Sequence, residues 1–205
     1  MEKARLPERA PPLSIDMLKA LCTYALNKLH DVPLATIMLL TFHCMLRIGE
    51  CVNLLVKDIV FGHSNAQLNL GLTKGGKRRG QSESVEATDP IVLQMLQSVL
   101  LPLEPGDRVF DYTYHMFQAK FGECLRAFHL QGYNFKTHSL RRGGTTFEFK
   151  AHGSYDIICE RGRWQNVRTA RLYIAEAVEL TNNLSLSIAS KTLITKYSEA
   201  FESLV

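Results

Sequence analysis

The chain has 205 residues, 46% of them hydrophobic and 21% charged, a composition typical of one compact globular domain with a sizeable core. The formal net charge of +4 permits a polyanionic partner without requiring one. The five cysteines include no C-x-x-C pair, which argues against a zinc ribbon or a disulfide framework and favours a reducing, intracellular compartment.

The first part of the chain predicts an unstructured lead-in followed by two helices. Residues 1–12 are charged and rich in proline, which indicates a disordered segment and no secretory signal. Ser14 can cap a helix whose apolar residues recur at helical spacing as far as Leu29. Pro33 can start a second helix that is apolar on nearly all sides, so we expect it to be central. The apolar run over residues 34–46 is too short for a membrane span.

The middle of the chain predicts a small sheet between helices. In chain order, the predicted segments are a short amphipathic helix over residues 48–55 and strands over residues 57–61, 67–72 and 82–88. A glycine-rich tip over residues 74–80 joins the last two strands. Asp89 and Thr113 are placed to cap two further helices. Within the second of these, Phe117 and Phe121 begin an apolar stripe.

The overall expectation is a mainly helical α+β fold with a small three-stranded antiparallel sheet that carries Lys74 on its edge turn. Residues 174–205 read as one or two helices. Their apolar stripe, which has little chain left to cover it, consists of Ile174, Ala177, Leu180, Leu184 and Ile188.

The stretch from His138 to Tyr173 holds the candidate chemistry. It places a ring nitrogen at His138 one helical turn before the guanidinium of Arg141, and it adds an indole at Trp164 and a phenol at Tyr173. A guanidinium grips phosphate with two hydrogen bonds, and a stabilised phenolate can form a covalent intermediate. Spacing alone is weak evidence, because His and Arg often share a helix face and buried aromatic rings are usually core.

Two blocks of sequence carry a resemblance to a known family. The pattern H-x-L-R at His138, followed by Gly162-Arg163-Trp164 and by Tyr173 nine residues after Trp164, resembles the second signature block of the tyrosine recombinase, or phage integrase, family. Its first block, an arginine in an R-I-x-E context, is matched by Arg47-Ile48-Gly49-Glu50. The residues of the second block are most similar to those of retroelement- and crypton-type members.

The resemblance covers residues from about 13 to 174, in the family's order, and implies the fold of a DNA breaking-rejoining enzyme. Family members normally carry a further helical DNA-clamping domain, the core-binding domain, ahead of this region. We therefore expect residues 13–205 to form a catalytic domain without that core-binding domain.

The resemblance also implies roles for the phosphate-binding residues and the nucleophile. Tyr173 would attack the scissile phosphate and leave a 3′-phosphotyrosine and a free 5′-hydroxyl, with no metal, ATP or other cofactor. Arg47 and Arg141 would grip the non-bridging oxygens, where the transition state gathers negative charge. Glu50 is expected to orient Arg47 through an ion pair.

The remaining catalytic positions keep alternatives open. His138 would contact the same phosphate or move the proton of Tyr173. Trp164 would donate its N–H to the phosphate, and pure packing is an equally good reading. Lys74 would protonate the leaving 5′-oxygen, with Lys77 as its rival.

Further basic residues are expected to bind DNA phosphates, which gives salt-dependent affinity that is blind to sequence. This predicted DNA-binding set consists of Lys77, Arg78, Arg79, Arg142 and Arg163. For Lys77, Arg78 and Arg79 the alternative is a solvent-exposed hairpin that does not bind DNA. No histidine or cysteine pair has the spacing of metal ligands, and no phosphate-cradling G-x-x-x-x-G-K-[ST] motif is present.

These observations predict site-specific DNA recombination or integration by strand cleavage and rejoining, in an intracellular protein located with DNA, in the nucleus if the source is eukaryotic. The alternative is a catalytically weak DNA-binding remnant or regulator derived from a mobile-element recombinase. The expected partners are double-stranded DNA and further copies of the chain, joined through the C-terminal helix in a tetrameric synapse, and no membrane. A third hypothesis treats the C-terminal stripe as a docking face for a neighbouring protein.

Overall fold

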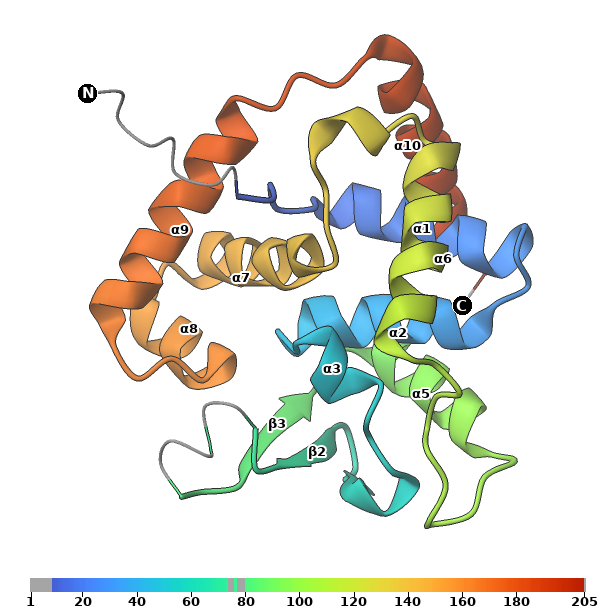
Figure 1. The fold of residues 1–205 in the computed structure, drawn as a ribbon, viewed down its shortest axis with the longest axis vertical. Coiled ribbons are helices and arrows are strands. Elements are labelled where there is room, and N and C mark those ends of the chain that lie inside the picture. Colours follow the sequence, from blue (N-terminus) through green and yellow to red (C-terminus); the bar gives the residue numbers. More distant parts are fainter. Residues whose placement is uncertain (1–8, 74–75, 77–79, 205) are drawn as a thin grey trace.

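The computed structural model describes residues 9–73, 76 and 80–204 (Figure 1). Outside the described residues lie residues 1–8 of the predicted lead-in and the four basic residues Lys74, Lys77, Arg78 and Arg79. The helices are α1 (Ile15–Asn27), α2 (Val32–His43), α3 (Ile48–Cys51), α5 (Pro90–Leu100), α6 (Tyr114–Ala127), α7 (His138–His152), α8 (Tyr155–Gly162), α9 (Val167–Asn182) and α10 (Ile188–Phe201). Two 3-10 turns, η1 (Val56–Asp58) and η2 (Gln131–Tyr133), join them.

The sheet consists of β1 (Ile59–Phe61), β2 (Ala66–Gly71) and β3 (Glu83–Ala87), antiparallel and in that order. Leu68 pairs with Ile59 on one side and with Val85 on the other. Alternate residues of β2 and β3 are buried, which sets one face of the sheet against the helices. The predicted fold class, mainly helical with a small three-stranded antiparallel sheet, is confirmed (Figure 1).

Short polar side chains start the helices, as the sequence predicts. Ser14 Oγ accepts a hydrogen bond from the backbone N–H of Met17 at 3.1 Å. Asp89 accepts bonds from the first turn of α5, and Thr113 caps α6 in the same way. Each cap satisfies backbone donors that the helix leaves unpaired. The second helix begins one residue before Pro33, where Asp31 is its cap.

Helix α2 is the centre of the core, as expected from its even distribution of apolar residues. All residues from Leu34 to Phe42 are buried. Helix α7 packs against α2 at the glycine pair, where a Cβ on Gly144 would come within 1.8 Å of the Phe42 carbonyl oxygen. A Cβ on Gly143 would come within 2.3 Å of the Leu13 carbonyl oxygen. The two glycines therefore permit a close backbone approach that holds the start of α7 in place.

Three predicted segments differ from the structure. The helix predicted for residues 48–55 ends at Cys51, because the chain turns there so that Leu54 enters the core and Leu55 bridges Arg108. Residues 10–12, part of the predicted disordered lead-in, are buried against the helical body. The exposed stripe predicted in the tail is half buried, since Ile174 and Ala177 lie in the interior and Ile188 is exposed.

Helix α10 returns to pack against α1 of its own chain (Figure 1). Phe201 is buried there, and the Tyr197 ring lies 5.2 Å from the Phe128 ring, centre to centre. Lys19 and Glu202 form an ion pair at 2.5 Å across the same contact. None of the helices in the described part of the chain is long and apolar enough to cross a membrane.

Candidate active site

The phenol of Tyr173 and the imidazole of His138 are in direct contact. Tyr173 lies in the middle of α9, and its Oη is 3.1 Å from Nε2 of His138, the first residue of α7. The two rings are perpendicular, with an angle of 87° between their planes. Residues 35 positions apart thus bring a phenol and an imidazole within hydrogen-bonding distance, the two side-chain types that covalent catalysis can use as nucleophile and base.

Arg141 lies one turn after His138 and is almost completely buried. Its Nη1 donates to the Met45 carbonyl oxygen, and its Nη2 donates to the Gly162 carbonyl oxygen at 2.7 Å. Its Cζ is 5.0 Å from the centre of the Trp164 ring, a cation–π distance. These contacts tie α7 to the turn after α2 and to the end of α8, and they fix the direction of the guanidinium.

Trp164 fills the space between Arg141 and Tyr173. Its ring centre lies 5.1 Å from that of Tyr173. A Cβ on Gly162 would fall within 1.9 Å of the Trp164 ring, so the glycine of the G-R-W motif makes room for the indole. The contacts of Trp164 within the described residues are with the Tyr173 ring and the Arg141 guanidinium.

Arg47 is presented by the short α3, where it is the residue before the first helical position. Its Nη1 donates to Glu50 Oε1 at 2.6 Å, and its backbone N–H donates to Glu50 Oε2 at 2.8 Å. The Arg47 side chain is 45% exposed, so it remains accessible to an anion. Glu50 and Arg47 therefore form the ion pair that the sequence suggests, with the guanidinium held at the surface.

The environment keeps both partners of the phenol–imidazole contact neutral. Burial raises the pKa of Tyr173 to about 12, and the nearby charges of Arg141 and Arg142 offset only part of that effect. Partial burial, with repulsion from Arg141, Arg142 and Arg47, lowers the pKa of His138 to about 4. A neutral imidazole can accept the hydrogen bond of the phenol, which an imidazolium could not do, and the order of the two pKa values keeps the proton on Tyr173 in the free chain.

Comparison with known proteins identifies the family. The family model for the phage integrase family matches residues 13–179. The chain belongs to the phage integrase family. Members are tyrosine recombinases, and the match spans His138, Arg141, Trp164 and Tyr173.

Solved structures of phage integrase family members share the fold. A crystal structure of the XerH site-specific recombinase bound to palindromic difH substrate, a post-cleavage complex, matches with a TM-score of 0.67 and 16% identity, over 86% of this chain and 52% of that chain. A crystal structure of XerA recombinase matches with a TM-score of 0.59 and 18% identity, over 95% of this chain and 66% of that chain. The chain thus spans about half the length of XerH. Among curated proteins, none is similar enough in sequence to count as a relative.

Four of the six residues that the integrase resemblance suggests as catalytic are joined by direct contacts: His138, Arg141, Trp164 and Tyr173. The charge of Arg47 is near enough to this group to lower the pKa values of His138, Arg141 and Tyr173. Lys74 lies outside the described residues. In the described part of the chain, no three His, Cys, Asp or Glu side chains come together to form a possible metal site.

Two members of the predicted DNA-binding set occupy a different environment from the one expected. Arg142 is buried, with its Cζ 4.8 Å from the centre of the Tyr173 ring and its Nη2 donating to Glu176 at 2.7 Å. Arg163 is only 7% exposed and donates to Glu50 at 2.7 Å. Neither guanidinium is presented to solvent, and each is paired with a carboxylate.

Glu176 and Glu83, which hold these two arginines, are residues that the sequence did not single out. Glu176 lies one helical turn after Tyr173, so its spacing could have indicated a partner for a basic residue near the nucleophile. Glu83 is buried on β3 and gives no comparable signal, since its partner Arg163 is 80 positions away.

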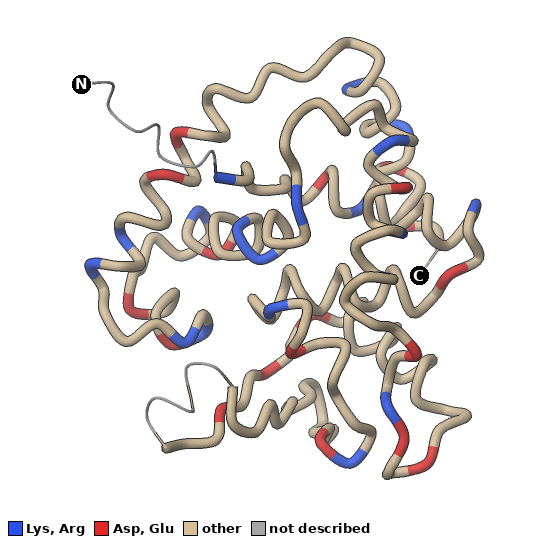
Figure 2. The backbone as a smooth tube through the Cα atoms, in the orientation of Figure 1, with Lys and Arg blue, Asp and Glu red and all other residues tan. Residues whose placement is uncertain are grey.

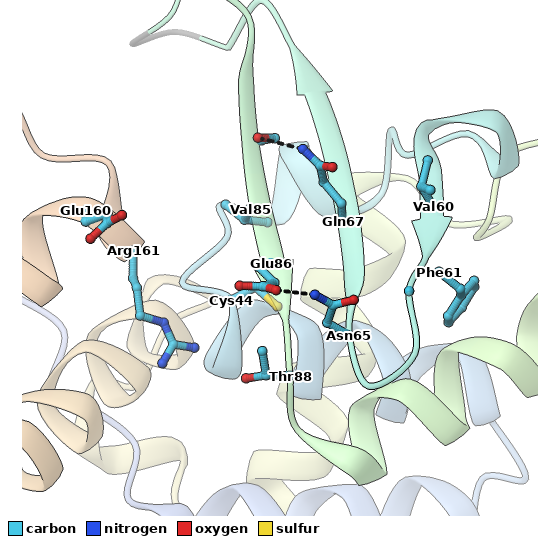
Figure 3. A pocket seen from close by; sticks show the side chains of 12 residues that line it. Cys44, Val60, Phe61, Asn65, Gln67, Val85, Glu86, Thr88, Glu160 and Arg161 are labelled. Atoms are coloured by element: carbon cyan, nitrogen blue, oxygen red, sulfur yellow. Dashed lines mark hydrogen bonds between the residues drawn. The ribbon is translucent and has the colours of Figure 1, made fainter.

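A cleft lies between the sheet and α8, and Tyr173 is not among the residues that line it (Figure 3). It has a volume of about 630 Å³. Glu160 and Arg161 reach it from α8, while Asn65 donates to Glu86 across the adjacent strands. Since none of the five described catalytic positions lines it, this cleft is separate from the integrase site.

Proposed function

We propose that this chain is the catalytic part of a tyrosine recombinase that cleaves and rejoins double-stranded DNA through a covalent 3′-phosphotyrosine at Tyr173. The observation that carries this proposal is the 3.1 Å contact between Tyr173 Oη and His138 Nε2, beside the buried Arg141. Membership of the phage integrase family supports the same reaction.

The proposed cleavage step needs two proton transfers, one from the attacking phenol and one to the leaving 5′-oxygen. Tyr173 Oη bonds to the phosphorus while its proton passes to Nε2 of His138, and the bond from phosphorus to the 5′-oxygen breaks. The 5′-oxygen leaves as a hydroxyl after receiving a proton, in this proposal from Lys74 or its rival Lys77. Rejoining runs in reverse with a second 5′-hydroxyl. One phosphodiester replaces another of similar energy, so no ATP is consumed.

Arg47 and Arg141 would stabilise the charge on the non-bridging oxygens. Arg141 uses two of its five N–H donors on the carbonyls of Met45 and Gly162, which fixes its orientation before DNA arrives. Removing one preorganised donor from such a site typically costs about 3 kcal/mol of transition-state stabilisation. Figure 2 shows Lys and Arg at the start of α3 and on α7, α8 and α9, around the same part of the molecule.

A nicked-substrate experiment tests the nucleophile without knowledge of the target sequence. The purified chain is incubated with a pool of random-sequence duplexes, each with a nick in one strand so that the short product diffuses away. Denaturing electrophoresis then detects covalent adducts. We expect adducts with the parent, with or without EDTA, and none with Tyr173→Phe. Mass spectrometry after nuclease digestion should place the nucleotide on Tyr173, and an equal yield from Tyr173→Phe would contradict the assignment.

The second candidate function is a DNA-binding regulator or remnant derived from a mobile-element recombinase. The observation in its favour is that the Arg141 guanidinium is buried, with both of its terminal nitrogens donating to backbone carbonyls. In that case gel shifts would show duplex binding with no covalent product after long incubation. Sequencing of the bound or trapped duplexes would also reveal any preferred site.

Self-association through α10 is a further part of the proposal. The contacts of Phe201, Tyr197 and Glu202 with the body of the chain could be made equally well by α10 of a second copy. Light scattering with and without bound duplex would measure the assembly. Removal of residues 182–205 should leave a monomer on DNA where the parent forms larger assemblies, and unchanged masses would exclude docking through this helix.

A further inference from the structure

We propose that Arg163 is a positioning residue that fixes Arg47 relative to the root of the β2–β3 connection, by bridging Glu50 on one side and Glu83 on the other. This inference rests on the proposed function, because it assigns Arg47 to the scissile phosphate. It replaces direct DNA binding as the role of the arginine in the G-R-W motif.

The first step is the placement of Arg163 itself. It follows the last residue of α8 with a φ of +58°, a left-handed conformation that favours glycine. Its side chain is 7% exposed. Nη2 donates to Glu50 Oε2 at 2.7 Å, and Nη1 lies 3.5 Å from Glu83 Oε2. One guanidinium therefore hydrogen-bonds to Glu50 and lies within ion-pair distance of Glu83, so its charge is shared by two carboxylates from separate elements.

The second step leads from Glu50 to the phosphate-binding position. Glu50 Oε1 accepts from Arg47 Nη1 at 2.6 Å, and Oε2 accepts from the Arg47 backbone N–H at 2.8 Å. The same Oε2 accepts from Arg163. Both oxygens are thus occupied, and Oε2 is shared between the Arg163 side chain and the backbone N–H of Arg47. Any shift of Arg163 is passed on to both the backbone and the side chain of Arg47.

The third step leads from Glu83 to the connection between β2 and β3. Glu83 is buried on β3, and its Oε2 accepts from the hydroxyl of Thr73 at 2.5 Å. The Thr73 hydroxyl oxygen also accepts from the backbone N–H of Gly76 at 3.1 Å. Thr73 directly precedes Lys74 in the sequence. Arg163 therefore contacts the residue that anchors the base of this connection.

A purely stabilising role explains these features poorly. Ion pairs that are buried contribute little to stability on average, because desolvation offsets their attraction. A glycine at position 163 would fit the left-handed backbone better than arginine does. Fixing the geometry of Arg47 accounts for both observations, since misplacement of a reacting group by about 1 Å can slow a reaction about 100-fold.

The charge of Glu50 gives a second readout. Its carboxyl is faced by Arg47, by Arg163, by Arg141 from α7 and by the Cys51 thiol within α3. Burial raises the pKa of Glu50, but Arg163 and the hydrogen bonds from Arg47 outweigh it, so the net pKa is lowered. Without Arg163 only the hydrogen bonds from Arg47 offset the burial effect, so the pKa of Glu50 would be higher than in the parent.

The test uses Arg163→Gly, which removes the guanidinium and suits the left-handed backbone, together with Arg163→Lys. The matched control is Arg161→Gln on the same helix, where Arg161 pairs with Glu148 at 2.6 Å and touches neither Glu50 nor Glu83. We expect Arg163→Gly to lower the rate of adduct formation on the nicked duplex pool about 100-fold, with duplex affinity within about threefold of the parent. Arg163→Lys should recover only part of the rate, because an ammonium cannot bridge both carboxylates in one plane.

The pH profile separates positioning from folding. Adduct formation by Arg163→Gly should fall as the pH is lowered through the raised pKa of Glu50, whereas Arg161→Gln should keep the parent's profile. Equal rates for Arg163→Gly and the parent, or equal losses for Arg163→Gly and Arg161→Gln, would overturn the proposal.

A thermal double-mutant cycle decides the bridge independently of catalysis. The changes in unfolding free energy caused by Glu50→Gln and Glu83→Gln should be non-additive in the parent background. In the Arg163→Gly background they should be additive. If the parent forms no adduct, the proposed function falls, and the cycle still tests the bridge. Additivity in the parent background would overturn the bridge even where cleavage is observed.

Discussion

The guanidinium of Arg142 lies against the face of the Tyr173 ring, with Cζ 4.8 Å from the ring centre, and it pairs with Glu176 on the same helix as the tyrosine. Arg142 on α7 thus contacts α9 at two residues one helical turn apart, Tyr173 and Glu176. Arg9 also reaches Glu176, at 2.5 Å, so the carboxylate is shared by two arginines. The arginine next to Arg141 in sequence therefore packs on the Tyr173 ring and helps to hold it in place.

Substitution of Arg142 should separate support of Tyr173 from DNA contact. We expect Arg142→Met to slow adduct formation about 10- to 100-fold, because the ring loses its cationic neighbour and Glu176 loses its buried partner. The measurements are the adduct rate and the salt dependence of duplex binding. A buried arginine that touches no phosphate leaves the salt slope unchanged, whereas loss of one phosphate contact lowers it by about 0.9.

The control for this experiment is Arg168→Met, an exposed basic residue in the first turn of α9. If Arg142→Met reduces the salt slope and leaves the adduct rate intact, Arg142 binds DNA directly and the support role is wrong.

The lowered pKa of His138 predicts how stability depends on pH. Unfolding returns the imidazole to its ordinary pKa of about 6.5, so the unfolded chain binds more protons between about pH 6.5 and pH 4. Stability contributed by neutral His138 is therefore complete above about pH 6.5 and is lost as the pH falls toward 4. Between these pH values, the free energy of unfolding measured with urea should fall more steeply with decreasing pH for the parent than for His138→Gln. Parallel curves would contradict the lowered pKa.

The glycine pair of α7 makes a prediction about stability. Gly144→Ala should lower the free energy of unfolding by an amount at the upper end of about 1–3 kcal/mol, because its Cβ would meet the Phe42 backbone at 1.8 Å. Thermal unfolding gives the measurement. Gly132→Ala is the control, since nothing lies within 4 Å of its added Cβ, and we expect a change within about 0.5 kcal/mol. Equal changes at the two positions would show that α7 can move away from α2.

Trp164 offers an optical probe, because it is the only tryptophan in the chain and lies between Arg141 and Tyr173. Duplex DNA that reaches the site should change its fluorescence emission in the parent and in Tyr173→Phe alike, since binding precedes attack. Arg47→Ala should weaken the response by raising the duplex concentration needed to produce it. A response that is independent of Arg47 would place the bound DNA elsewhere on the surface.

Much of the fold follows from local patterns in the sequence. The caps at Ser14, Asp89 and Thr113 depend only on a short polar side chain and the next three backbone donors, so local sequence specifies them. The alternating burial of β2 and the even burial of α2 likewise follow from the order of apolar residues. The boundary of α3 does not, because the contacts of Leu54 and Leu55 with distant segments end it at Cys51.

For the candidate site, the sequence by itself supplied the residue types and the family resemblance, and it identified the pair Arg47 and Glu50, which are three positions apart. Only the tertiary structure decided which arginines face outward. Arg142 and Arg163 read as DNA contacts because both are basic and near the motif, yet each is buried against a carboxylate distant in sequence. Burial and long-range pairing set the role of a charged side chain, and both depend on how α7, α8, α9 and the sheet pack together, which no local spacing encodes.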